Sequence, residues 1–186
     1  LTTNSFYSND DEWHTASFVS TYEFEGSQLF YSFADAELDY ANDGMLNPTT
    51  TYLSNINLQV RTQELRWSST GDRLVDWTMG YYLREAERND SSQVGGAPPS
   101  SSTQTNDAYA LFGEATVKLP DPRWAVTAGL RYFSDDVDAI SVSTTRTSTL
   151  NATFDSWNPR VSLSYKPERD TTLYASAARG FRSGQL

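Results

Sequence analysis

Hydrophobic and polar side chains alternate along most of this chain with a period of two residues. In one stretch, Trp124, Val126 and Leu130 fall on one face of an extended segment, whereas Thr127 and Arg131 fall on the other. Similar stretches of about ten residues recur along the chain, and they predict β-strands. The expected strands are 13–24, 28–39, 55–68, 74–85, 107–119, 123–134, 156–166 and 171–181.

The connections between the expected strands alternate in length. Four connections are tight turns, at 25–27, 69–73, 120–122 and 167–170. Three are long polar segments, at 40–54, 86–106 and 135–155. Up-and-down barrels of the bacterial outer membrane have this asymmetry, with short turns on the periplasmic rim and longer loops outside. The pattern therefore predicts an all-β fold, an antiparallel up-and-down transmembrane β-barrel segment of about eight strands.

Large aromatic side chains lie near the ends of the apolar faces. Trp124 and Tyr132 are eight residues apart on one face, and so are Trp157 and Tyr165. Eight residues of strand span roughly 26 Å, and a tilt of about 40° reduces that height to about 20 Å. This is close to the apolar band of about 25 Å between the aromatic girdles of outer-membrane barrels. We therefore predict that these four side chains, together with Trp77, face lipid.

Charged side chains alternate with the proposed lipid-facing residues. In the barrel interpretation they point into the lumen, because an Arg on the lipid side costs about 2–4 kcal/mol at the bilayer midplane. The lumen-facing candidates are Glu64, Arg66, Glu114, Arg131, Arg160 and Lys166. They would form a solvated wall that holds a plug by salt bridges, or line a substrate passage, and the two roles are compatible.

One expected strand, 55–68, changes phase part of the way along. Three apolar residues near its start share one face, and two near its end fall on the other: Ile56, Leu58 and Val60 against Leu65 and Trp67. A β-bulge adds one residue to a strand and so shifts the alternation by one position. The sequence therefore predicts a bulge near 61–63 that returns all five side chains to one side.

Four stretches of the sequence resemble the barrel domain of TonB-dependent outer-membrane receptors. The stretches are TQELRWSS at 62–69 with DWTMGYY at 76–82, YALFGEA at 109–115, AVTAGLRY at 125–132, and WNPRVSLSY at 157–165 leading into LYASAARGFRSG at 173–184. Each is a weak pattern alone, but their order and spacing together are specific. The resemblance covers the chain from Leu58 onward, whereas 1–57 match only in style.

The resemblance implies a barrel of 22 strands with an N-terminal plug domain inside it. We therefore expect residues 1–186 to be an internal part of the barrel domain, without the plug domain or the C-terminal strands. It also implies an outer-membrane location, contact with lipid, and coupling to the TonB complex through the plug. The implied function is uptake of a large, scarce ligand. A ferric siderophore is the leading expectation, with cobalamin, haem and oligosaccharide as alternatives.

Composition and the absence of known motifs argue against several other classes of function. A net charge of −10 argues against a nucleic-acid partner. There is no cysteine, a single histidine (His14), and no HExxH, GxGxxG or P-loop pattern, so the common zinc and nucleotide sites have no support. We expect no catalytic residues, no metal site and no cofactor. The cluster Asp135, Asp136 and Asp138 is expected to be a solvated acidic loop, with a weak divalent-cation site as the alternative.

Two other functions are compatible with the strand pattern. The first is a complete small eight-stranded outer-membrane barrel with a structural or adhesion role, because eight strands can close. The second is a soluble all-β carbohydrate-binding or hydrolase domain that turns its apolar faces inward.

Overall fold

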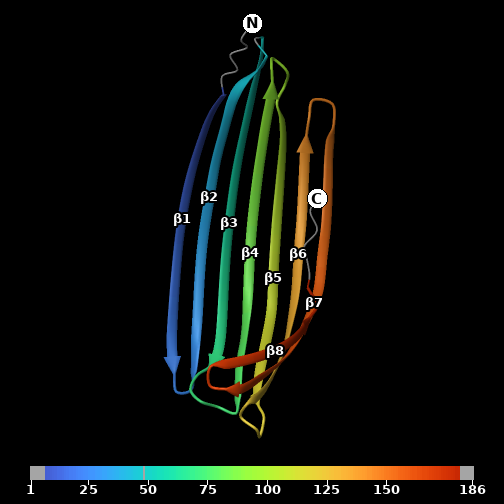
Figure 1. The fold of residues 1–186 in the computed structure, drawn as a ribbon. Coiled ribbons are helices and arrows are strands. Elements are labelled where there is room, and N and C mark those ends of the chain that lie inside the picture. The colour runs from blue at the N-terminus through green and yellow to red at the C-terminus, as the bar shows by residue number, and fades with distance from the viewer. Residues whose placement is uncertain (1–6, 48, 181–186) are drawn as a thin grey trace.

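The computed structural model describes residues 7–47 and 49–180, and it shows a single antiparallel sheet (Figure 1). Each strand pairs with its neighbour in sequence, in the order β1 to β8. The strands are β1 (Tyr7–Phe24), β2 (Ser27–Asn47), β3 (Thr50–Ser69), β4 (Val75–Val94), β5 (Ser100–Lys118), β6 (Trp124–Val142), β7 (Thr147–Glu168) and β8 (Thr171–Ala178). Within the described ranges, β1 and β8 do not pair with each other, so the sheet is open.

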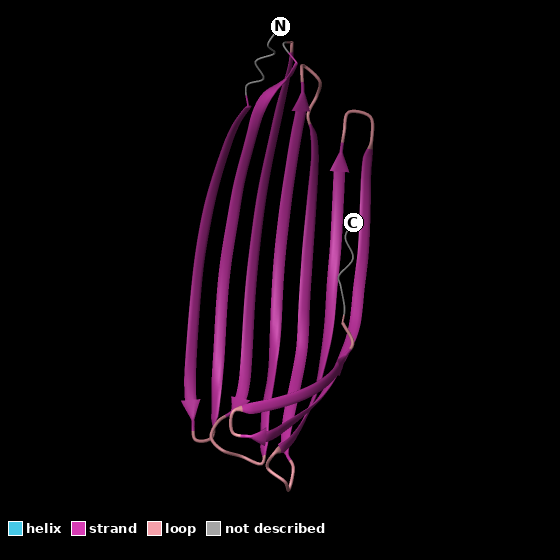
Figure 2. Cartoon of the chain, in the orientation of Figure 1, coloured by secondary structure: helices cyan, strands magenta, loops and turns pink. Residues whose placement is uncertain are grey.

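The predicted fold class is confirmed, since each of the eight expected strands overlaps one observed strand, although the last observed strand already ends at Ala178. Position 181, the last residue of the eighth expected strand, lies outside the described residues. Figure 2 shows only strands and connections in the part of the chain that is described, and no helix there is long and apolar enough to span a bilayer.

Strands β2 to β7 are roughly one and a half times as long as the sequence predicted, whereas β8 is shorter than predicted. Those from β2 to β7 contain 19 to 22 residues, or about 65 Å at about 3.3 Å per residue. A tilted membrane strand needs only about 9–11 residues. The three predicted long loops are therefore wrong as loops, because 40–54, 86–106 and 135–155 are mostly the paired ends of neighbouring strands.

The four predicted tight turns lie at one end of the sheet, but the connections at the other end are short as well, so the predicted difference between the two rims is not observed. The predicted tight turns join β1 to β2, β3 to β4, β5 to β6 and β7 to β8 (Figure 1). The first contains only Glu25 and Gly26, and Gly26 has a φ of 76°. Positive φ at the second residue of this turn favours glycine, which adopts that conformation without steric cost. We call the half of the sheet nearest these turns the proximal half, and the other the distal half.

The predicted bulge at 61–63 is wrong. The pairing of β3 with β2 and with β4 runs through these positions without a register shift. Irregularities occur elsewhere, between Met45 and Asn47 and between Tyr165 and Glu168. Val60 and Leu65 therefore lie on opposite faces of the sheet. The apolar side chains of β3 thus change from one face to the other along the strand.

The two faces are named here by side chains of the proximal half. The tryptophan face carries Trp67, Trp77, Trp124 and Trp157, and the arginine face carries Arg66, Arg131 and Arg160. In the proximal half the tryptophan face is apolar, with Leu29, Met79, Leu111, Leu130 and Val161. In the distal half the same face carries Glu37, Asp39, Glu87, Asp136 and Asp138.

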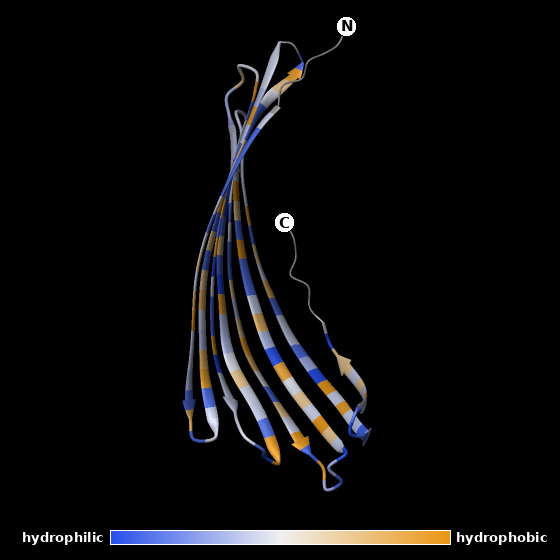
Figure 3. Ribbon diagram, turned by 60° about the vertical axis from the view of Figure 1, so that its left-hand side comes forward, coloured by the Kyte–Doolittle hydropathy of each residue, from blue (hydrophilic) through white to orange (hydrophobic). Residues whose placement is uncertain are grey.

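The arginine face changes in the opposite sense. In the distal half it carries apolar side chains on β2, β3, β6 and β7, namely Leu38, Leu58, Val60, Val137 and Leu150. Figure 3 shows the alternation of hydrophilic and hydrophobic residues along the curved and twisted strands. A strand that passes from hydrocarbon into water must make its outer side polar, so this exchange marks the end of the membrane-compatible part of the sheet.

Candidate functional site

Two rows of aromatic side chains cross the tryptophan face of the proximal half. Near the tight turns, the rings of Trp124 and Tyr165 stack with centroids 4.2 Å apart. Eight residues further along both strands, the rings of Tyr132 and Trp157 lie 4.8 Å apart. Each pair is formed by residues directly opposite each other on β6 and β7. The predicted spacing of these aromatics therefore becomes two parallel rows on one face.

The row nearest the turns continues on β3 and β4. There the rings of Trp77 and Trp67 meet edge to face with centroids 5.2 Å apart. All five predicted girdle residues thus share one face of the sheet. The apolar side chains between the rows are solvent-accessible in the isolated sheet, including Leu111, which is 54% exposed, and Val161, which is 51% exposed. A contiguous exposed apolar surface of this kind marks a membrane or partner interface.

The arginine face holds the six predicted lumen-facing residues, spread over β3, β5, β6 and β7 rather than gathered into one cluster. On β3, Arg66 lies 3.4 Å from Glu64 and its guanidinium lies over the ring of Phe30, 4.6 Å from the centroid. On β6, the guanidinium of Arg131 lies 5.5 Å from the ring centroid of Phe133. Lys166 follows Ser164 on this face, next to the turn end of β7.

One ion pair on this face bridges two strands that are not neighbours. Arg160 on β7 lies 3.6 Å from Glu114 on β5. The strand between them, β6, contributes Gly129, which is opposite both residues. A Cβ at this position would lie 3.1–3.3 Å from the Glu114 side chain. The missing side chain therefore leaves the space through which the two charges meet.

A second pair repeats this arrangement further along the sheet. Arg84 on β4 lies 3.5 Å from Asp135 on β6, across Ala108 on β5. The Asp135 side chain is fully buried, and Ala108, Ala110 and Val137 are buried around this point. Both ion pairs thus cross a strand at a small residue, and both lie on the arginine face.

The acidic cluster at 135–138 is divided between the two faces. Asp135 is a buried strand residue, so its assignment to a solvated loop is wrong. Asp136 and Asp138 lie on the tryptophan face, where they accept hydrogen bonds from Thr153 (2.6 Å) and Asn151. In the part of the chain that is described, no group of three or more His, Cys, Asp or Glu side chains is arranged to hold a metal ion. His14 is exposed on β1, and its Nε2 lies 3.1 Å from Glu12.

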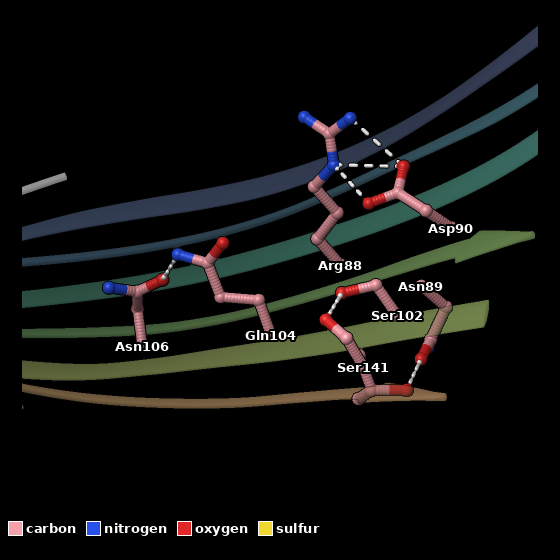
Figure 4. Close-up of polar contacts among 8 residues, drawn as sticks. Arg88, Asn89, Asp90, Ser102, Gln104, Asn106 and Ser141 are labelled. Atoms are coloured by element: carbon pink, nitrogen blue, oxygen red, sulfur yellow. Dashed lines mark hydrogen bonds and ion pairs between the residues drawn. The ribbon is translucent and has the colours of Figure 1, made fainter. Parts of the chain in front are cut away.

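A polar network on the arginine face of the distal half had not been singled out in the sequence. Arg88 donates from Nε and Nη2 to the Asp90 carboxylate at 2.8–3.1 Å (Figure 4). This carboxylate raises the pKa of the Arg88 guanidinium. Hydroxyl groups pair across the strands beside it, Ser92 with Ser100 at 2.9 Å and Ser102 with Ser141 at 3.1 Å.

This network borders a concave surface of about 500 Å³, which is also lined by Tyr52 and by Arg146 from the turn between β6 and β7. The serines belong to a segment whose composition suggested a loop. Ser100, Ser101 and Ser102 are consecutive, so the sequence shows no alternation at this point and gives no signal that these serines are strand residues. The surface offers guanidinium and hydroxyl groups, which bind by hydrogen bonding and by charge.

The geometry defines the wall of an outer-membrane barrel, with an apolar band between two aromatic rows on one face and charges on the other. All 186 residues match the family model described as "TonB dependent receptor-like, beta-barrel". The chain therefore belongs to the TonB-dependent receptors, a family of transport receptors in the outer membrane of Gram-negative bacteria. This confirms the resemblance found in the sequence and the outer-membrane location, and it favours a receptor over both alternative functions.

Solved structures give the same fold. The ferric yersiniabactin uptake receptor FyuA from Yersinia pestis has a TM-score of 0.75 at 18% identity, over 92% of this chain and 28% of that one. The siderophore receptor PiuA from Acinetobacter baumannii has a TM-score of 0.72 at 10% identity, over 95% and 33% of the two chains. For the copper transporter OprC the TM-score is 0.67 at 17% identity, over 90% and 30%. A comparison with curated protein sequences gives no significant match.

The chain spans between 28% and 33% of the length of these three structures. Because the sequence identities to these structures are below 20%, the likeness shows a shared fold only.

Proposed function

We propose that this chain forms part of the barrel wall of a receptor that takes up a ferric siderophore with the help of TonB. The observation that supports the placement in the membrane is the change in character along the tryptophan face. On this face the strands are apolar in the proximal half and acidic in the distal half. Family membership supports coupling to TonB, and the names of two of the reported structures support a siderophore as the ligand.

In this proposal the tryptophan face of the proximal half meets lipid. Trp77, Trp124 and Tyr165 belong to the girdle near the tight turns, and Tyr132 and Trp157 belong to the opposite girdle. Tyrosine and tryptophan are favoured at both membrane interfaces because their rings are apolar while their polar groups can reach water.

The arginine face then lines the lumen. Glu64, Arg66, Glu114, Arg131, Arg160 and Lys166 form a charged, hydrated wall against a plug domain or a passing ligand. Charges are tolerated there because each can be paired or solvated, as Glu114 and Arg160 pair across Gly129. None of these side chains performs covalent chemistry in the proposed mechanism.

The tight turns lie in the periplasm, and the distal half projects from the cell. Its arginine face becomes the inner wall of the receptor mouth, where Arg88, Asp90 and the paired serines lie beside Tyr52 and Ile56. A ligand that reaches this wall meets hydrogen-bonding groups and apolar surface side by side. Movement of a plug driven by TonB and the proton gradient then opens the passage below.

We also propose that residues 1–186 are an internal part of the barrel domain. The chain covers about a third or less of each reported structure. Open strand edges carry unpaired backbone groups that lipid cannot satisfy, so β1 and β8 require further strands. These strands and the plug domain belong to the complete receptor.

Single-cysteine labelling of the complete receptor in cells tests the orientation. Val161 and Ser162 are neighbours on β7 with opposite faces. Val161→Cys should react only with a membrane-soluble maleimide, whereas Ser162→Cys should react with a small water-soluble thiosulfonate. The reverse reactivity would overturn the placement.

Uptake is tested with a strain that lacks the receptor gene. We expect slower growth when individual ferric siderophores are the sole iron source, and the same defect when the gene is present but TonB is deleted. Normal growth of the receptor-deficient strain on every ferric siderophore supplied would contradict the proposed ligand class. Uptake that persists without TonB would contradict the coupling.

A further inference from the structure

A shallow apolar groove of about 650 Å³ crosses the tryptophan face of the proximal half. It lies between the two aromatic rows and extends over β2 to β7, with Trp67, Met79, Leu111, Leu130, Tyr132 and Trp157 among its lining residues. Five strand spacings of about 4.8 Å give it a length of about 24 Å. The groove lies entirely on strands described here, and its shape therefore requires no other part of the receptor.

The floor of the groove is formed where side chains are missing. Gly113 on β5 is opposite Met79 on β4 and Leu130 on β6, so a gap separates these two side chains. Beside it, Gly80 is covered from the arginine face by Phe112, whose ring would come within 2.4 Å of a Cβ at Gly80. The Phe112 ring thus closes the sheet beneath the groove, which is a depression and not a passage.

The side of the groove nearest the distal half is made of rings. Tyr132 contacts Trp157, with ring centroids 4.8 Å apart, and its hydroxyl donates to Asp155 at 2.9 Å. This hydrogen bond holds the polar end of Tyr132 toward the distal half and leaves its ring toward the groove. The groove therefore offers a long apolar surface with a fixed rim.

We propose that this groove seats one acyl chain of a bilayer lipid, more tightly than the rest of the lipid-facing surface does. The proposal rests on the orientation given above, in which the tryptophan face meets lipid. A hydrocarbon chain gains van der Waals contacts along the whole groove and requires no polar partner.

The charges on the same face argue against a second copy of the chain as the occupant. Further along the strands, in the distal half, the tryptophan face carries Glu37, Asp39, Glu87, Asp136 and Asp138. Two copies packed through their grooves would bring these carboxylates together, and like charges at short distance repel. An uncharged acyl chain avoids this repulsion.

The test fills the groove at its floor. A Cβ at Gly113 would lie 3.7 Å from the carbonyl oxygen of Thr78 and 4.0 Å from the Cβ of Met79, which are ordinary contacts. The sheet therefore accommodates a Cβ at this position, and Gly113→Leu places its side chain in the groove. The matched control is Ala115→Leu, two residues further on the same strand and face but outside the groove.

The readout is lipid retention by the complete receptor. After incubation with dipalmitoyl phosphatidylethanolamine, native mass spectrometry should show one retained lipid on the wild type and on Ala115→Leu. In Gly113→Leu the retained fraction should fall about tenfold, which corresponds to about 1.4 kcal/mol. Equal retention by the two variants, or none by the wild type, would overturn the proposal. So would a receptor dimer that only Gly113→Leu dissociates, because the occupant would then be a second copy.

A second measurement separates this proposal from the orientation on which it rests. Brominated acyl chains quench tryptophan fluorescence on contact. If the tryptophan face meets lipid, they should quench Trp67 and Trp157 in the wild type. Quenching together with equal retention by the two variants would overturn the groove alone, whereas a loss of quenching at both tryptophans would overturn the orientation.

Discussion

The proximal and distal halves of the sheet share strands β1 to β7 and their hydrogen-bonded register, yet the tryptophan face is opposite in character in the two halves. Leu130 and Asp138 lie on one face of β6 only eight residues apart, one in the apolar band and the other among carboxylates. The backbone does not change between them, because pairing with β5 and β7 continues without a shift. The surrounding medium, rather than the secondary structure, therefore selects the side chains.

The largest expected effect comes from placing a charge on each half of one face. Leu130→Arg puts a guanidinium in the apolar band and should destabilise the complete receptor by about 2–4 kcal/mol. Ile140→Arg, ten residues along the same strand and face, lies in the distal half and should change stability by less than about 0.5 kcal/mol. Urea unfolding of the receptor in lipid vesicles measures both. Equal losses would break the comparison.

The boundary between the halves is tested at the Arg84–Asp135 pair. Arg84→Met removes an ion-pair partner of a fully buried carboxylate and should cost about 2 kcal/mol, below the usual range for buried pairs because Arg84 itself is partly exposed. Asp135→Asn in addition should recover part of this loss, since it removes the buried charge. The same unfolding assay checks both variants, and a neutral Arg84→Met would show that the pair contributes little.

The small residue at Gly129 gives a third test, within the proximal half. Gly129→Val introduces atoms into the contact between Glu114 and Arg160 and should cost about 1–2 kcal/mol through overpacking. Ala128→Val adds two methyl groups on the opposite, tryptophan face and should be nearly neutral. If the midpoints of urea unfolding fall equally, crowding on the arginine face is not the cause.

The smallest effect is expected at a proximal turn outside the membrane band. The guanidinium of Arg123 donates to Asp121 and holds the pKa of this carboxyl below its usual 3.8. A lowered folded-state pKa stabilises the fold at pH above the unfolded-state value, and this contribution is lost as the pH falls through the lowered pKa. The unfolding midpoints of wild type and Asp121→Asn should therefore differ slightly at pH 7 and converge in strong acid. A difference that grows in acid would contradict this assignment.

The sequence predicted the proximal half better than the distal half for a physical reason. In the proximal half apolar and polar residues alternate and aromatic residues lie near the strand ends, so the strands, their faces and the two aromatic rows could be found from the sequence. In the distal half Ser92, Ser100 and Ser102 occupy paired strand positions, but serine and glycine composition is also typical of loops. Pairing with the neighbouring strand decided between the two, and a single sequence does not report pairing.

The candidate site, too, could be predicted from the sequence only in part. Alternation placed Glu114 and Arg160 on one face, as the structure does. Their contact across Gly129 depends on which residue of β6 is opposite both, and this register is a tertiary property. Alternation alone would have predicted that Asp135 and Asp136 lie on opposite faces. This was missed because the segment was assigned to a loop.

Pairing between sequence neighbours alone gives the wall a modular construction. Each hairpin is complete in one continuous stretch of polypeptide, so a barrel can gain or lose two strands without rethreading any other part. Its circumference can then change in steps of one hairpin, while every remaining strand keeps its own neighbours and its own boundary between lipid and water.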